Sequence, residues 1–132
     1  MKPISVRSFY YIIALIIFLI EITIARGLFG YGFIRGSVGD ILVIALIYAL
    51  FRACNTPPLR SALFSIAAGF VVEGLQYIHL VDLLGLQKGS VLYIVIGNTF
   101  SPHDLLMYII GGVLAWGLDQ AIFRIKSPIQ HR

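Results

Sequence analysis

The chain has 132 residues, of which 59% are hydrophobic and only 12% are charged, with a net charge of +4. Soluble domains carry about 25% charged residues, so this composition excludes an ordinary soluble domain and indicates that the solvent is lipid. The length predicts one integral membrane domain over residues 1–132. The basic residues cluster at the ends of apolar runs, which excludes nucleic acid as their partner, and the single Cys54 excludes an internal disulfide.

Two apolar runs in the first third of the chain predict a pair of membrane-spanning helices. The first is predicted over about residues 8–25 and contains Glu21. No small-residue cleavage pattern follows it, so we interpret it as an uncleaved span and not as a signal peptide. The second run, residues 41–51, is shorter than the roughly 20 residues that a span requires. Its helix is therefore predicted over about residues 38–55, which places Asp40 inside the membrane boundary.

The second half of the chain predicts two further spans. The third is predicted over about residues 59–81, after Pro57 and Pro58, and the fourth over about residues 103–123. The segment between them alternates short apolar and polar stretches that are too short to span, so an interfacial or re-entrant element is predicted there. The expected fold is an all-α, four-helix transmembrane bundle.

The basic residues predict the orientation of the bundle. Three of them fall on one side of the predicted membrane: Arg26, Arg35 and Lys88. The other seven fall on the opposite side: Lys2, Arg7, Arg52, Arg60, Arg124, Lys126 and Arg132. Because cytoplasmic loops carry an excess of Lys and Arg, this split predicts that both termini are cytoplasmic.

Acidic residues gather near the opposite, outward-facing ends of the spans. Five of the six acids lie there: Glu21, Asp40, Glu73, Asp82 and Asp104. An ionisable group within the membrane costs about 2.5–3.5 kcal/mol on insertion scales, so such groups mark functional sites. Isolated buried charges should also find partners. We therefore predict that Arg35, Asp40, Glu73 and Asp104 converge in one cluster.

The third predicted helix carries a polar stripe in which Gly69, Glu73 and Gln76 share one face. Glu73 with Gln76 one turn away is a candidate catalytic acid with a hydrogen-bonding orienter, and Gln76 is a candidate substrate-binding residue. The alternative is that Glu73 only joins helices, as polar side chains do in membrane bundles.

Ser37-x-x-Asp40 and Ser101-x-x-Asp104 precede the second and fourth predicted helices. Each is a variant of the capping box, in which an acid in the first turn also complements the helix dipole. The alternative is a ligand site, in which Arg35 and Asp40 bind substrate. Arg35 suits an anionic group because its guanidinium donates hydrogen bonds in a bidentate fork.

On the fourth predicted helix, Asp104 is a second candidate catalytic acid, and Tyr108 lies one turn below it. Tyr108 is a candidate substrate-binding residue that either donates to the Asp104 carboxylate or belongs to the interfacial aromatic belt, as we expect for Tyr10. Asp119 is expected to pair with Arg124 or to meet water. His79 and His103 lack the spacing of a metal-binding pair, so neither a metal nor a cofactor is predicted.

Several motifs after the first predicted helix resemble those of a known family. They are Arg35-Gly36-Ser37-Val38-Gly39-Asp40, Glu73-x-x-Gln76, Leu84-Gly85 and Gly97-x-x-Phe100-x-x-x-Asp104-x-x-x-Tyr108-x-x-Gly111. Together they resemble the bacterial domain-of-unknown-function family 2809, which is itself similar to the VanZ-like membrane proteins. VanZ-like proteins carry Glu-x-x-Gln and, later, Asp-x-x-x-Asn-x-x-Gly, in which Tyr108 here replaces the Asn. VanZ is linked to teicoplanin resistance, so the resemblance implies cell-envelope chemistry in the bacterial inner (cytoplasmic) membrane.

These observations predict an outward-facing polar site that recognises or modifies an amphiphile of the outer leaflet. The expected partner is a membrane lipid or a lipid-linked envelope molecule, with Glu73 and Asp104 as acid or base in any chemistry. The alternative is a non-enzymatic membrane subunit or small transporter whose buried charges form a structural or proton-relay network. Catalysis should leave room for a ligand beside the acids, whereas a purely structural network should have its partners mutually satisfied and no cavity.

Overall fold

The computed structural model describes residues 5–25, 34–97 and 101–126. Every regular element in these residues is a helix, and four helices are long and apolar enough to cross a membrane: α1 (Val6–Ala25), α2 (Gly39–Ala53), α3 (Pro58–Tyr77) and α6 (Pro102–Lys126). The remaining elements are one π-helical turn and two short helices: η1 (Ile34–Val38), α4 (Leu80–Leu83) and α5 (Val91–Ile96). This confirms the predicted all-α bundle of four spans, with a non-spanning segment before the last.

Local sequence accounts for where the spans begin and end. η1 continues directly into α2, so the second apolar span covers Gly36–Ala53 and starts before Asp40, as expected. α3 begins at Pro58, which suits the first helical turn because its missing N–H needs no partner there. α3 ends at Tyr77, before the predicted boundary at residue 81, because His79 takes a left-handed φ of 57° and turns the chain into α4.

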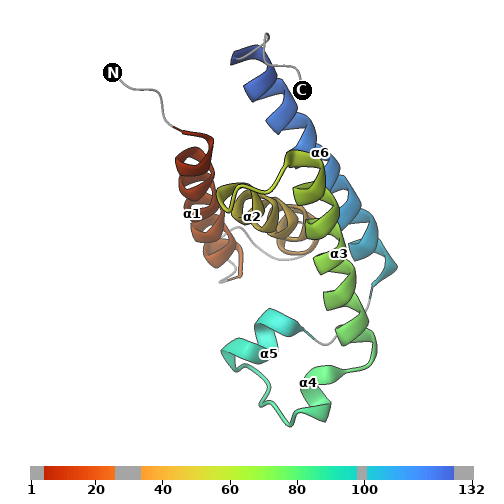
Figure 1. The fold of residues 1–132 in the computed structure, drawn as a ribbon. Coiled ribbons are helices and arrows are strands. Elements are labelled where there is room, and N and C mark those ends of the chain that lie inside the picture. Colours follow the sequence, from red (N-terminus) through yellow and green to blue (C-terminus); the bar gives the residue numbers. More distant parts are fainter. Residues whose placement is uncertain (1–4, 26–33, 98–100, 127–132) are drawn as a thin grey trace.

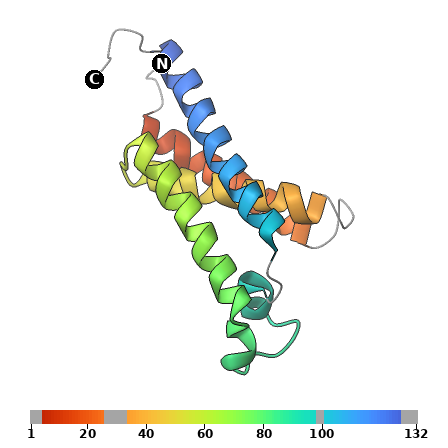
Figure 2. The same ribbon diagram turned by 90° about the vertical axis from the view of Figure 1, so that its right-hand side faces the viewer.

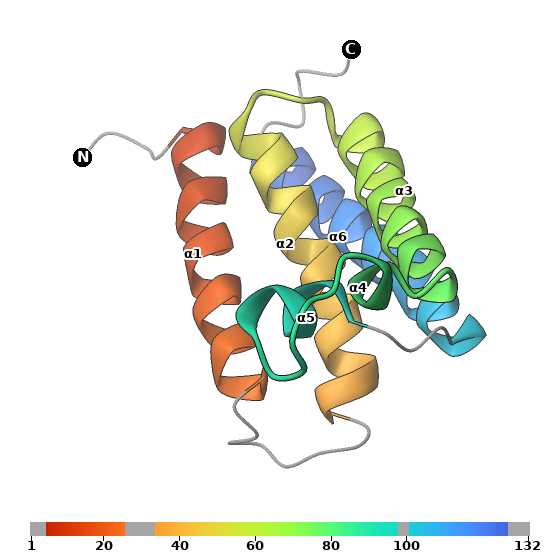
Figure 3. The ribbon, with the colours of Figure 1, turned by 90° about the horizontal axis from the view of Figure 1, so that it is seen from below.

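The central helix of the bundle is α2. It packs against α1, α3 and α6, and α3 also packs along α6. Figure 3 shows α2 between α1 on one side and the α3–α6 pair on the other. Figure 2 shows the α1–α2 hairpin crossing the α3–α6 pair at a steep angle.

The bundle has two ends that differ in the residues they carry. At the terminal end α1 and α3 begin and α2 and α6 end. At the acidic end α1 and α3 end and α2 and α6 begin, and α4 and α5 extend beyond the bundle there (Figure 1). The predicted re-entrant or interfacial element therefore lies at the same end as most of the acids.

The surface of the bundle carries many large apolar side chains. The main buried cluster joins α1 and α2 in the terminal half through Tyr10, Tyr48 and Ala49, among others. Large apolar side chains remain exposed on every spanning helix, with Leu15 and Leu63 as examples at 59% and 57% exposure. Extensive exposed apolar surface marks contact with lipid or with other proteins. The structure is consistent with a multi-pass membrane protein.

Candidate functional site

Glu73 is the centre of the polar contacts at the acidic end. It lies on α3, one turn before the end of that helix, and is only 1% exposed. Its Oε1 accepts a hydrogen bond from the Tyr108 hydroxyl at 3.0 Å, and its Oε2 accepts one from the Ser101 backbone N–H at 3.1 Å. Both donors belong to α6 or the residue before it. Glu73 thus joins the end of α3 to the start of α6.

A glycine allows Tyr108 to reach Glu73. A Cβ atom on Gly69, one turn before Glu73, would stand 2.7 Å from the Tyr108 Cδ2 atom. Tyr108 is only 4% exposed, so its hydroxyl lies among helices and the interfacial belt is excluded. One of the two alternatives predicted for Tyr108 is a hydrogen bond to the Asp104 carboxylate. Tyr108 does donate to a carboxyl group, but the acceptor is Glu73.

Two further carboxyls meet Glu73 from other helices. Asp40 lies in the first turn of α2 and Asp104 in the first turn of α6. The Asp104 carboxyl lies close enough to both Asp40 and Glu73 to interact with them, and the Tyr108 hydroxyl lies close to all three. We call Asp40, Glu73 and Asp104 the acidic cluster. A carboxyl group accepts hydrogen bonds when it is ionised and can donate one when it carries a proton, so neighbouring carboxyls can serve as acid or base.

The residues around the acidic cluster differ in part from the four that the sequence predicted to converge, Arg35, Asp40, Glu73 and Asp104. Glu21 on α1 lies close enough to Asp40 for the two carboxyls to interact. Within the side chains that the structure describes, no carboxyl of the acidic cluster forms an ion pair with a lysine or arginine. The side chain of Arg35, the fourth expected member, lies outside the described residues, as does Arg26.

Among the described residues, some buried acceptor atoms at the acidic end have no donor. Three buried oxygens have no hydrogen-bond partner among the described residues: Glu21 Oε1, Asp40 Oδ2 and Gln76 Oε1. An unpaired buried acceptor costs about 1–3 kcal/mol. The acidic end therefore offers unused acceptors to a molecule that carries N–H or O–H groups.

Gln76 fastens the segment that follows α5. Its Nε2 donates a hydrogen bond to the Ile96 carbonyl oxygen at 2.6 Å. Gly97 comes next, with a left-handed φ of 78°, and a Cβ atom there would stand 2.6 Å from Gln76 Nε2. The described hydrogen bond of Gln76 thus goes to Ile96 and does not orient Glu73. Glu73 and Gln76, one turn apart on α3, hold the two ends of residues 96–101.

The structure corrects half of the capping interpretation. Asp40 and Asp104 do stand in the first turns of their helices. Ser37, however, does not cap α2: it lies within η1, and its Oγ is hydrogen-bonded to His103 Nε2 at 2.8 Å. The preceding π-helical turn replaces a side-chain cap at the start of α2. The Ser37–His103 contact ties the start of α2 to the start of α6.

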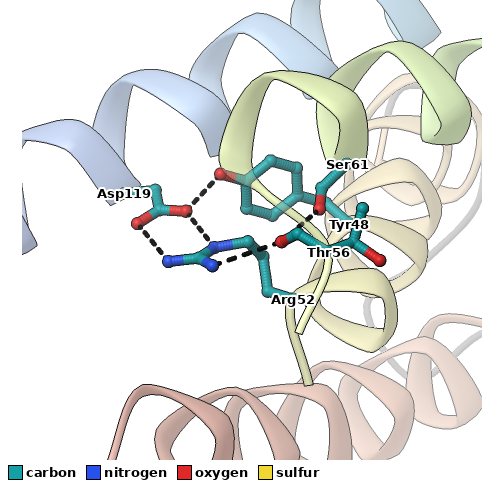
Figure 4. A network of polar contacts seen from close by, with 5 residues as sticks. All are labelled: Tyr48, Arg52, Thr56, Ser61 and Asp119. Atoms are coloured by element: carbon teal, nitrogen blue, oxygen red, sulfur yellow. Dashed lines mark hydrogen bonds and ion pairs between the residues drawn. The ribbon is translucent and has the colours of Figure 1, made fainter. Parts of the chain in front are cut away.

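A second polar cluster, at the terminal end, lies between α2 and α6 (Figure 4). Asp119 on α6 is 2% exposed and accepts hydrogen bonds from Arg52 Nε at 2.6 Å and Arg52 Nη2 at 3.4 Å. The Tyr48 hydroxyl donates to the same carboxylate. We call Tyr48, Arg52 and Asp119 the clamp.

Further contacts complete the clamp. Arg52 Nη1 donates to the Thr56 carbonyl oxygen at 3.3 Å, and the Ser61 hydroxyl donates to the same oxygen, also at 3.3 Å. The Arg52 guanidinium lies over the Tyr10 ring, 5.1 Å from its centroid. Tyr10 is 5% exposed, so its expected place in the interfacial belt is wrong.

Asp119 is buried and bound by Arg52, a partner that the sequence prediction did not include. The side chain of Arg124, its expected partner, lies outside the described residues. Tyr48 and Arg52 are four residues apart on α2 and share one face. This spacing indicates that the two side chains can bind one carboxylate on a neighbouring helix. Which acid stands opposite depends on how α2 and α6 cross.

Among the described residues, no group of three or more His, Cys, Asp or Glu side chains could hold a metal ion.

The fold and these clusters define a class: a small helical protein with membrane-spanning helices, a paired polar clamp at one end and a carboxyl-rich site at the other. A family model described as "Protein of unknown function (DUF2809)" matches residues 29–112, more than half of the chain, and the chain belongs to this family. The matched region includes the acidic cluster and Tyr108 but ends before Asp119. No curated protein and no solved structure matches the chain.

Proposed function

We propose that the acidic end is an outward-facing site that recognises or modifies the head group of an amphiphile in the outer leaflet. The observation that carries the proposal is the convergence of Asp40, Glu73 and Asp104 beside buried oxygens with no donor among the described residues. A head group rich in hydroxyl or amine groups supplies the donors that these oxygens lack. The seven-to-three distribution of basic residues supports the outward orientation.

The chemistry proposed for the site follows from its carboxyls. Glu73 and Asp104 lie close together and would serve as acid or base toward the bound molecule. Tyr108 places a hydroxyl donor beside them. Arg35, at the start of the second span, is proposed to hold an anionic part of the same molecule. The resemblance to VanZ-like proteins is the reason for proposing a lipid-linked cell-envelope precursor as the amphiphile.

The test is complementation of cells that lack the protein, with susceptibility to teicoplanin and other cell-wall inhibitors as the phenotype. We expect Glu73→Gln and Asp104→Asn to abolish complementation at normal protein levels, because each amide keeps the shape of the side chain and removes its acid. Asp82→Asn is the matched control, since Asp82 is an exposed acid at the same end. Full complementation by both site variants contradicts a chemical role.

A second candidate function has an observation of its own. Both Glu73 oxygens are satisfied by protein donors, Tyr108 and Ser101, as in a structural network. The alternative is therefore a non-enzymatic membrane subunit or small transporter in which these carboxyls join helices or relay protons. It predicts that Glu73→Gln is fully active while Glu73→Leu lowers protein abundance.

A further inference from the structure

An apolar groove lies in the terminal half of the bundle, away from the acidic cluster. α1 and α6 form its walls and α2 forms its floor, and its volume is about 160 Å³. Two alanines of α2, Ala45 and Ala49, line the floor, and Ala115 of α6 adds a third small side chain. Larger side chains at these three positions would fill the space. The rings of Phe9 and Phe123, with centroids 5.4 Å apart, join the two walls.

We infer that this groove holds an acyl chain of an anionic phospholipid from the leaflet at the terminal end. All the lining residues belong to helices that are apolar and long enough to span a membrane, so the molecules beside the groove are hydrocarbon chains. Among the described lining residues, Asp119 carries the only charged group, and its carboxylate is already bound by Arg52 and Tyr48. The lining therefore has no unsatisfied charge that calls for a polar ligand.

The volume of the groove suits one hydrocarbon chain and not a protein helix. An apolar cavity of about 150 Å³ stays dry and binds a molecule as small as benzene. A groove of about 160 Å³ therefore takes a short stretch of one hydrocarbon chain. A transmembrane helix, about 10–12 Å across with its side chains, is far too large to enter it.

The charge of the terminal end selects an anionic head group. Seven of the ten basic residues are predicted at this end. Arg7 lies on α1 just before the groove residue Phe9, is exposed, and stands 5.9 Å from the centroid of the Tyr11 ring. Arg52 is occupied by Asp119 and Thr56, so Arg7 is the arginine that we assign to the phosphate.

The test uses the full chain in phosphatidylcholine vesicles that contain a phosphatidylglycerol probe with a diazirine in mid-chain. After illumination, the positions of the adducts are mapped by mass spectrometry. Leu118 lines the groove and Leu63 of α3 does not, yet they are 63% and 57% exposed. We expect several-fold more adducts on Leu118 than on Leu63, and competition by unlabelled phosphatidylglycerol more than by phosphatidylcholine.

Two pairs of variants test separately the binding of the acyl chain and the binding of the lipid head group. Ala45→Phe fills the groove and should bring Leu118 labelling down to that of Leu63, whereas Ala121→Phe, on an exposed position of α6, should not. Arg7→Gln should lower the preference for phosphatidylglycerol about fivefold, the effect of one basic residue near an anionic surface, whereas Arg60→Gln on α3 should not.

Several outcomes overturn the inference. Equal labelling of Leu118 and Leu63 in the unmodified chain means that only bulk lipid is present, and this comparison decides the matter even if Ala45→Phe does not fold. Protection of the groove from the probe, together with a particle of two chains, means that a second copy covers it. An unchanged lipid preference in Arg7→Gln removes the anionic head group from the inference.

Discussion

The two polar clusters of this protein are built alike and balanced differently. The clamp joins α2 to α6 and the acidic cluster joins α2, α3 and α6. In each a tyrosine hydroxyl donates to a buried carboxyl: Tyr48 to Asp119 in the clamp and Tyr108 to Glu73 at the acidic end. In the clamp, the single acid Asp119 forms an ion pair with Arg52. The acidic cluster brings three acids together without an ion pair to any lysine or arginine whose side chain is described.

This difference in charge balance separates a structural network from a candidate site. A paired and hydrogen-bonded acid can be buried without a ligand, because its partner replaces water. Carboxyls that lie close together, beside oxygens with no donor among the described residues, are arranged at a cost to stability. Local arrangements that lower stability are typical of functional sites.

The largest expected effect is at the clamp. Asp119→Ala leaves Arg52 buried without its counter-charge and should destabilise the protein by about 3–5 kcal/mol. Replacing both partners, with Arg52→Met and Asp119→Leu, should restore most of this loss, because apolar side chains of similar size need no partner. Thermal unfolding in detergent measures both variants. A double variant as unstable as Asp119→Ala would show that the ion pair is not what holds this end together.

The next effect is at the acidic end. Glu73→Leu removes the acceptor of two buried donors, Tyr108 Oη and Ser101 N, at about 1–3 kcal/mol for each donor. Glu73→Gln keeps an acceptor oxygen and should lose less than half as much. The same unfolding measurement compares the two. Equal losses for Leu and Gln would mean that the charge of Glu73, and not its acceptor geometry, stabilises the contact.

A glycine substitution should disturb the acidic end alone. A Cβ atom on Gly111 would stand 2.9 Å from the Ile41 carbonyl oxygen, next in sequence to Asp40. Gly111→Ala should therefore push α2 from α6 at that end and cost about 1–3 kcal/mol. Gly117→Ala on the same helix meets nothing within 4 Å and should stabilise by about 0.5–1 kcal/mol. Crosslinking between cysteines at positions 40 and 104 reports the separation; an unchanged yield in Gly111→Ala contradicts it.

The smallest expected loss of stability is that of Tyr108→Phe, and Tyr48→Phe in the clamp is the variant to compare it with. Tyr48→Phe removes a hydrogen bond to the charged Asp119 and should cost about 1.5–3 kcal/mol. Tyr108→Phe should cost about 0.5–1.5 kcal/mol if the Glu73 carboxyl that accepts its hydrogen bond is uncharged. Denaturant unfolding of the two variants gives the difference. A larger loss for Tyr108→Phe would place the negative charge of the acidic cluster on Glu73.

The sequence by itself determined the four spans and the place of the acids along them. The length of an apolar run and the position of a polar residue within it are local properties, so composition and spacing are sufficient to predict them. The shared face of Gly69, Glu73 and Gln76 could likewise be predicted from helical periodicity. The start of α3 at Pro58 and the first-turn positions of Asp40 and Asp104 are local in the same sense.

Only the tertiary structure decided which polar groups meet. Arg52 and Asp119 are 67 residues apart, and Tyr108 and Glu73 are 35 apart. Each pairing depends on the rotation of a helix about its axis and on how two helices cross. Close packing sets both, here through Gly69 beneath the Tyr108 ring and Gly111 against Ile41. Spacing along one helix carries no information about the helix opposite, which is why sequence reasoning did not find Arg52 as a partner of Asp119.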